Sequence, residues 1–154
     1  MKQVKDSIRL PVIVNGDILN VADARAALRL SGADGVMIGR GCYGRPWLPA
    51  QVAHALAGGD ELPDPDLATE KDIVLEHYRA MLSHFGAHPG LRLARKHVSW
   101  YSAGLPGSAQ FRATVNRVDD VVQAVGLIEE FYDRQIEAGG RRERATGPLE
   151  DLAA

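Results

Sequence analysis

The chain has 154 residues, which is a length for one domain or for two very small ones. Its 45% hydrophobic and 25% charged residues are ordinary for a folded protein and exclude a wholly disordered chain. No apolar run approaches the ~18 residues that a membrane-spanning helix needs, and no apolar stretch follows the first residues, so we expect neither a membrane partner nor a secretory signal. The single cysteine, Cys42, excludes an internal disulfide and a cysteine-cluster metal site, which favours a reducing, cytoplasmic location.

The first sixty residues predict strands that alternate with helices. Strands are expected at 10–14 and 36–38, and helices at 21–30 and 47–56. Asn20 directly precedes the first helix and is a suitable N-cap. Because buried strands that alternate with helices at this spacing are typical of parallel sheets, we expect the two strands to pair in parallel.

The remainder predicts an all-helical part. Helices are expected over 69–85, 91–103 and 109–115, and then to about 138. Thr69 resembles the start of a capping box, and Asn116 is a candidate cap for the last helix. The predicted fold class is thus α/β followed by all-α. The predicted boundaries are 1–60 for the α/β part, 61–68 for a linker, 69–138 for the helical part and 139–154 for a disordered tail.

Charge is distributed unevenly along the chain. The stretch from His77 to Val118 contains no Asp or Glu, yet it holds six of the eighteen Lys and Arg residues and four of the five histidines. A basic block inside an otherwise acidic chain favours a polyanion as partner. The alternative is a solvated face whose cations pair with acids elsewhere in the chain.

Two turns carry the clearest chemistry, Asn15-Gly16-Asp17 after the first strand and Gly39-Arg40-Gly41 after the second. Ligands of parallel α/β structures bind at the carboxyl ends of strands. Glycine lets backbone N–H groups approach a phosphate, and the guanidinium of Arg40 matches phosphate oxygens. Two such turns on neighbouring strands therefore predict phosphate binding, whereas either turn alone would be an ordinary βα connection.

The helix expected over 91–103 carries a basic face. Three cations and a hydroxyl share that face: Arg92, Arg95, Lys96 and Ser99. The opposite, apolar face is expected to carry Leu91, Ala94, Val98 and Tyr101. Such a helix can follow a nucleic-acid backbone, while His97, Trp100 and Tyr101 either stack on bases or pack in the core of a helical bundle.

No catalytic or metal-binding constellation is apparent. Cys42 has no local His–Asp pair to activate it, so we expect a small, partly buried cysteine. His84 and His88 flank an expected loop at Gly86-Ala87, without the helical spacing and nearby acid of a metal site. The sequence therefore predicts neither a catalytic residue nor a metal ligand.

Several stretches resemble bacterial tRNA-dihydrouridine synthases. Residues 11–18 and 32–41, followed by Gly44-Arg45-Pro46-Trp47, are similar to the end of their flavin barrel. Their C-terminal helical domain is matched by Arg95-Lys96-His97, Trp100-Tyr101, 104–109, Phe111-Arg112 and Asn116. The likeness covers residues 8 to 135 and is strongest to the B-type branch. It implies the last two βα units of an incomplete TIM-type barrel, followed by a small helical bundle.

This resemblance implies a flavoprotein oxidoreductase. In that family NAD(P)H reduces FMN, the flavin passes hydride to a tRNA uracil, and a cysteine supplies the proton, which yields 5,6-dihydrouridine. The FMN-contacting turns of the family are matched by Asn15, Gly16, Asp17, Gly39 and Arg40, with the phosphate nearest Gly39 and Arg40. The family's helical domain binds tRNA, and our own candidates for that contact are Arg92, Arg95, Lys96 and Arg112.

A complete barrel of this type needs ~250 residues, and the family's first six strands and proton-donating cysteine have no counterpart here. We therefore expect the chain alone to lack synthase activity, to bind FMN weakly at most and to self-associate through its open sheet edge. One alternative is a non-catalytic RNA-binding or assembly module. Another is the end of a different phosphate-binding barrel, which would not explain the basic helical part.

Overall fold

The computed structural model describes residues 2–140 and 142. The chain divides into two compact units, Met1–Asp64 and Pro65–Ala154. Among the described residues, no helix combines the length and the apolar character needed to cross a membrane.

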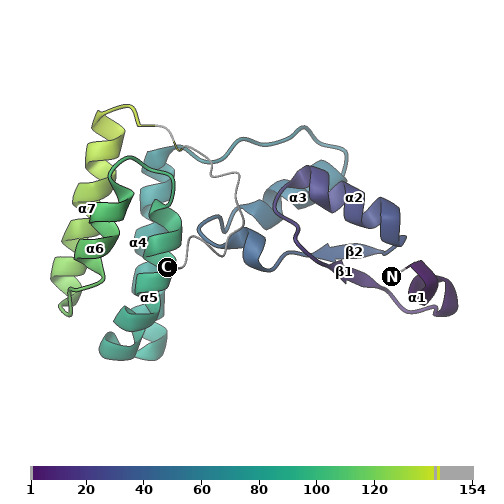
Figure 1. The fold of residues 1–154 in the computed structure, drawn as a ribbon, viewed down its shortest axis with the longest axis horizontal. Helices are drawn as coiled ribbons and strands as arrows, with labels where there is room; N and C mark the ends of the chain where they lie inside the picture. Colours follow the sequence, from purple (N-terminus) through teal and green to yellow (C-terminus); the bar gives the residue numbers. More distant parts are fainter. Residues whose placement is uncertain (1, 141, 143–154) are drawn as a thin grey trace. The chain divides into compact units, whose positions relative to one another are not determined.

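The first unit combines a small sheet with helices (Figure 1). In chain order it contains α1 (Lys2–Ser7), β1 (Ile13–Asn15), α2 (Val21–Ser31), β2 (Gly35–Met37), the 3-10 turn η1 (Arg40–Cys42) and α3 (Leu48–Leu56). The expected parallel pairing is confirmed, with Val14 opposite Val36 and Asn15 opposite Met37. Helix α1 was not expected, because none of its residues is buried and it therefore leaves no apolar periodicity in the sequence.

Helix α2 begins and ends where local chemistry predicts. The side chain of Asn20 accepts a hydrogen bond of 2.8 Å from the backbone N–H of Asp23, as expected of an N-cap. At the other end Gly32 adopts a left-handed φ of 66° and donates to the carbonyl of Leu28. The apolar core of this unit is formed by Ile18, Val21, Ala24, Leu48, Val52 and Ala55.

The two faces of the sheet differ in burial. Val14 is 8% exposed, whereas its neighbour Ile13 and the cross-strand Met37 are 53% and 51% exposed. Successive side chains of a strand point to opposite faces, so one face packs on the unit's core while the other carries uncovered apolar side chains. Among the described residues, each strand pairs only with the other.

The second unit is a bundle of four helices (Figure 1). These are α4 (Leu67–Phe85), α5 (Ala87–Ser102), α6 (Ser108–Val115) and α7 (Val121–Glu137). Helix α4 packs on both α5 and α7. The predicted apolar face of α5 is confirmed, because Leu91, Ala94, Val98 and Tyr101 are all buried.

Two of the predicted helix caps are wrong. Helix α4 begins two residues before Thr69, and its N-cap is Asp66, whose carboxylate accepts from the Thr69 N–H at 2.7 Å. Asn116 ends α6, whereas α7 is capped by Asp120. In both places the sequence offers several good caps within a few residues, and an aspartate at the observed start satisfies a free N–H as well as the residue predicted.

The expected loop around His84 and His88 is also wrong. His84 lies in the last turn of α4, and α5 begins at Ala87, so a single residue, Gly86, separates the two helices. Gly86 has a φ of 83°, which a residue with a side chain rarely adopts. A single glycine therefore reverses the direction of the chain, where the sequence predicted a longer loop.

Candidate functional site

The structure brings the two predicted phosphate turns together. Because Asn15 lies opposite Met37 in a parallel pair, both strands end at the same edge, and the next residues of each form the turns. The Nη2 atom of Arg40 lies 3.1 Å from the Oδ1 atom of Asp17, and both side chains are exposed. Five predicted residues therefore meet at one edge: Asn15, Gly16, Asp17, Gly39 and Arg40.

The backbone at this edge is open to a ligand. No heavy atom lies within 4 Å of the place that a Cβ would take at Gly16 or at Gly39. Asp17 has a φ of 39°, which is uncommon for a residue with a side chain and holds the first turn in a tight left-handed bend. An anion could reach the backbone between the turns, with the guanidinium of Arg40 as its counter-charge.

A cluster around Asp64 was missed by sequence reasoning. The Oδ1 atom of Asp64 accepts from Arg45 Nη2 at 3.3 Å, from Trp47 Nε1 at 2.9 Å and from Gln51 Nε2 at 3.1 Å. Gln51 also donates to the carbonyl of Pro63 at 2.9 Å. The Gly44-Arg45-Pro46-Trp47 stretch therefore holds the predicted linker against α3. An acid among prolines was the only hint of this in the sequence.

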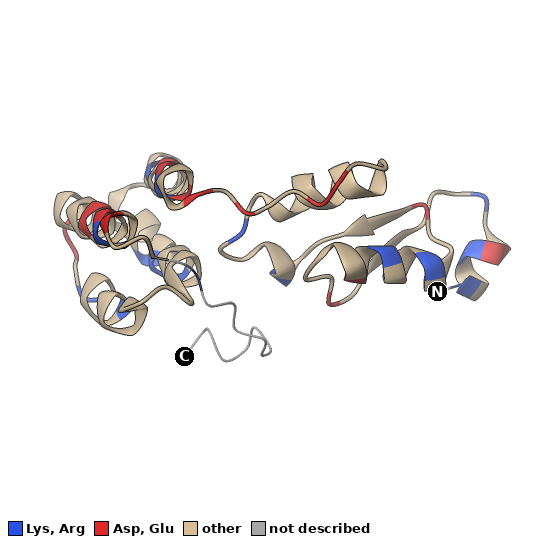
Figure 2. Ribbon diagram, turned by 90° about the horizontal axis from the view of Figure 1, so that it is seen from above, with Lys and Arg blue, Asp and Glu red and all other residues tan. Residues whose placement is uncertain are grey.

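The four predicted tRNA-contacting residues fall into two groups. Arg92 and Lys96 are exposed one turn apart on α5, and neither forms an ion pair with any residue that the structure describes. Arg95 and Arg112 instead donate hydrogen bonds to other residues of the helical unit. Figure 2 shows the positions of the basic and acidic residues along the ribbon. Arg92 and Lys96 are therefore accessible to a polyanion in this conformation.

Arg95 ties α5 to the segment before α7. Its Nη2 atom donates to the carbonyl of Val118 at 2.9 Å and to the carboxylate of Asp119 at 2.6 Å. The Nε atom of Arg95 is buried without a hydrogen-bond partner among the described residues. Arg112 donates to the hydroxyl of Ser108 at 3.3 Å. Contact with tRNA stays a prediction for all four residues.

Aromatic side chains of α4 and α5 form a half-buried row beside the cations. The ring of His97 lies edge-on to those of His77 and Trp100, with centroids 4.8 and 5.0 Å apart. Burial lowers the pKa of both histidines, and His77 lowers that of His97 further. Burial and Glu70 raise the pKa of Tyr101 to about 12, so its phenol stays protonated, and its oxygen lies 3.0 Å from His77 Nδ1. The row is therefore uncharged at neutral pH.

A buried carboxylate joins three parts of the helical unit. Glu70 of α4 is 2% exposed and accepts from the hydroxyl of Tyr132 at 2.7 Å. The guanidinium of Arg142 bonds the same carboxylate and donates to the carbonyl of Tyr101 at 2.7 Å and to that of Ala103. Burial and Glu70 raise the pKa of Tyr132, so its phenol stays protonated. Arg142 falls in the tail predicted to be disordered; residues 141 and 143–154 of that tail lie outside the described residues.

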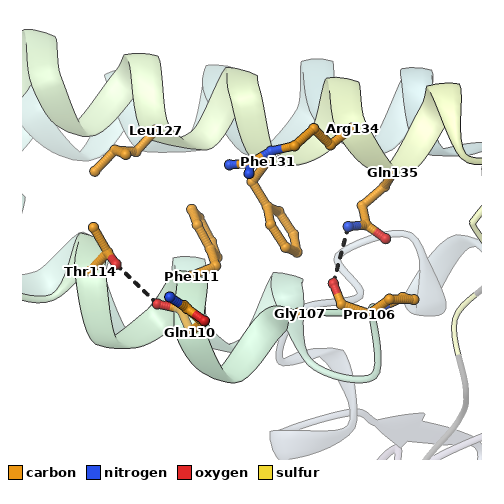
Figure 3. Close-up of a pocket in the computed structure, with 9 residues that line it drawn as sticks. All are labelled: Pro106, Gly107, Gln110, Phe111, Thr114, Leu127, Phe131, Arg134 and Gln135. Atoms are coloured by element: carbon orange, nitrogen blue, oxygen red, sulfur yellow. Dashed lines mark hydrogen bonds between the residues drawn. The ribbon is translucent and has the colours of Figure 1, made fainter.

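A groove of about 410 Å³ runs between α6 and α7 (Figure 3). The rings of Phe111 and Phe131 stack at 4.1 Å in its floor, and Gln135 closes one end by donating to the carbonyl of Pro106 at 3.0 Å. Both phenylalanines are buried, at 8% and 4% exposure. The floor thus belongs to the packing between the two helices.

The structure assembles no nucleophile or metal cluster from the described residues. Cys42 is half-buried, as expected, and its Sγ lies 2.9 Å from the carbonyl oxygen of Gly39. Within residues 2–140 and 142, no group of three or more His, Cys, Asp or Glu side chains is placed to hold a metal ion.

Comparison with known proteins matches residues 1–137 to the dihydrouridine synthase family model. The "probable tRNA-dihydrouridine synthase" of Rickettsia bellii is 51% identical over 132 residues, which are 86% of this chain and 40% of that protein. The "tRNA-dihydrouridine synthase B" of Xanthomonas axonopodis pv. citri is 44% identical over 134 residues, which are 87% of this chain and 40% of that protein. The chain thus spans about 40% of the length of these relatives.

Proposed function

Because this chain belongs to the dihydrouridine synthase family, we propose that it forms the C-terminal part of an FMN-dependent tRNA-dihydrouridine synthase. In such an enzyme NAD(P)H would reduce the flavin, and the flavin would supply the hydride that converts a tRNA uridine to 5,6-dihydrouridine. We assign two tasks to the chain, which are to hold the phosphate end of FMN and to bind tRNA. Cytoplasm, where tRNA is found, is the location that this function requires.

The first unit would supply the last two βα units of a TIM-type barrel. A barrel needs strands on both sides of β1 and β2 and side chains that fill its interior. The uncovered side chains of Ile13 and Met37 suit such an interior, and each strand has an outer edge without a described partner. Without further strands, the same edge and face favour self-association of the chain.

The phosphate of FMN would lie between the two turns. The single observation that supports this most is the parallel pairing that brings Asp17 and Arg40 within 3.1 Å at one strand edge. The open backbone at Gly39 lets a phosphate oxygen come close, and Arg40 would neutralise its charge. Asp17 cannot donate to phosphate, but it can orient the Arg40 guanidinium or accept from a ribityl hydroxyl.

The helical unit would bind tRNA through α5. Arg92 and Lys96 point to the same side one turn apart, and the uncharged row of His97 and Trp100 offers aromatic surface beside them. Arg95 and Arg112 would contribute to tRNA binding if their present hydrogen bonds within the helical unit are broken. The chain contains no residue that we assign to proton transfer, so we expect no synthase activity from it alone.

A titration with FMN and with riboflavin tests the phosphate site. We expect FMN, and not riboflavin, to shift the backbone amide signals of Gly39 and Arg40 in NMR spectra of the chain. Arg40→Ala should weaken FMN binding by about tenfold, because a charged hydrogen bond contributes roughly 1.5–3 kcal/mol. An affinity for FMN that survives Arg40→Ala unchanged contradicts the assignment.

The salt dependence of tRNA binding tests the second task. Each phosphate contact contributes about one unit to the slope of log affinity against log salt, so Arg92→Ala/Lys96→Ala should lower that slope by about two. Arg29→Ala removes an exposed cation from α2 and is the matched control, expected to change nothing. Salt-dependent tRNA binding without any FMN effect would instead favour a non-catalytic RNA-binding module.

A further inference from the structure

The segments that follow β1 and β2 touch at three successive points. The first is the Asp17–Arg40 ion pair at 3.1 Å, and the third is a hydrogen bond of 3.2 Å from Arg45 Nη1 to the carbonyl of Leu19. Between them the backbone of Gly41 lies directly against the carbonyl of Ile18. The two turns are therefore held in one register along their length.

Only glycine fits at the middle point. A Cβ built on Gly41 would lie 2.1 Å from the carbonyl oxygen of Ile18 and 3.3 Å from Cγ2 of Ile38. The two nearest atoms, the carbonyl oxygen and carbon of Ile18, belong to the backbone and not to a flexible side chain. Ile18 is 3% exposed and packs in the core with Leu48 and Val52, so its carbonyl cannot retreat without moving that core.

The neighbour of Gly41 is Arg40, which we have assigned to the FMN phosphate. Arg40 begins η1, and Gly41 is its second residue, so any displacement of η1 moves Arg40 as well. A Cβ at position 41, 2.1 Å from the Ile18 oxygen, needs at least about 1.3 Å of relief to reach an ordinary contact distance. A shift of that size would draw the guanidinium away from Asp17 and alter the gap between the two turns.

We propose that Gly41 is a positioning residue of the flavin phosphate site, whose lack of a side chain sets the distance between the two turns. This inference rests on the proposed function, since it assigns a further residue to the same site. Gly41 touches no ligand itself. It acts through Arg40 and through the backbone of Gly39, which it holds against the first turn.

The experiment compares three forms of the full chain, the wild type, Gly41→Ala and Gly126→Ala. Gly126 of α7 has no atom within 4 Å of a built Cβ, so this control makes the same chemical change without a collision. FMN affinity is measured by titration, and the ligand-free proteins are compared by amide NMR. For Gly41→Ala we expect FMN binding about tenfold weaker and shifted amide signals at residues 16–19 and 38–43. Gly126→Ala should match the wild type in both.

The outcomes separate this inference from the proposed function. Wild-type chain whose amide signals at Gly39 and Arg40 do not shift at the highest FMN concentration that can be reached refutes the phosphate site itself and, with it, this inference. Gly41→Ala that binds FMN like the wild type refutes the positioning role alone. If Gly41→Ala does not fold, Arg45→Met replaces it, because that variant removes only the side-chain bond to Leu19 and that to Asp64. Arg45→Met should weaken FMN binding severalfold, because it removes another contact that holds the two turns together. An unchanged affinity overturns the proposal, because FMN binding would then not depend on the distance between the turns.

Discussion

Replacing Arg142 by methionine is expected to destabilise the helical unit by about 3 kcal/mol. The change removes the Arg142 guanidinium from the Glu70 carboxylate, which is 2% exposed. Breaking a buried ion pair from one side costs roughly 3–5 kcal/mol. We take the lower end of that range because the Arg142 side chain is 17% exposed and the Tyr132 hydroxyl still donates to Glu70 at 2.7 Å.

Urea unfolding followed by the fluorescence of Trp100 measures this cost. All variants carry Trp47→Phe, so that the only remaining tryptophan reports on the helical unit. Arg134→Met is the matched control, because its pair with Glu130 is 3.3 Å long but more than 60% exposed on both sides. Exposed pairs of this kind contribute about 0.3–0.5 kcal/mol.

A double-mutant cycle refutes or supports the reasoning. If the cost arises from an uncompensated buried charge, Glu70→Gln should remove most of the penalty of Arg142→Met, since the remaining partner is then neutral. An Arg142→Met variant as stable as the Arg134→Met control would refute the role of Arg142. An equal penalty with and without Glu70→Gln would place that role in its bonds to the α5 carbonyls instead.

Three further predictions concern the same unit. Asp66→Ala should cost about 1 kcal/mol of unfolding free energy, because the first turn of α4 loses its cap; a Thr69→Ala variant equally destabilised by urea would instead favour the predicted capping box. Since burial lowers the pKa of His77 and His97 below 6.5, these two histidines bind protons more tightly in the unfolded chain than in the folded one. Stability should then be complete above about pH 6.5 and fall as the pH drops below it, and a urea midpoint independent of pH from 7 to 5 contradicts this. Arg95→Met should lower the free energy of unfolding by about 1–2 kcal/mol, because the bonds of Arg95 to the segment before α7 are lost. Thermal unfolding measures this loss. Unchanged stability would show that these bonds do not hold Arg95 in place, so that its side chain is available to tRNA.

Features that depend on neighbouring residues could be predicted from the sequence alone. The alternation of apolar runs and Gly-rich turns predicted two parallel strands, and the helical spacing of Leu91, Ala94 and Val98 predicted the buried face of α5. Asn20 was recognisable as a cap because its bond reaches only three residues along the chain. Helix and strand periodicity are local properties, so they can be read without knowing the fold.

Which polar groups contact one another could not be predicted, because it depends on how the helices and strands pack. Arg95 and Asp119 are 24 residues apart in the chain, and Tyr132 and Glu70 are 62 apart. Nothing local marks Arg95 as bonded within the helical unit, or Lys96 beside it as a cation that forms no ion pair with a described residue. Gly41 likewise looks like one glycine among sixteen until the carbonyl of Ile18 lies against it. Which atoms come within 3 Å of each other depends on how the elements pack, and packing sums many weak contacts between residues far apart in the sequence.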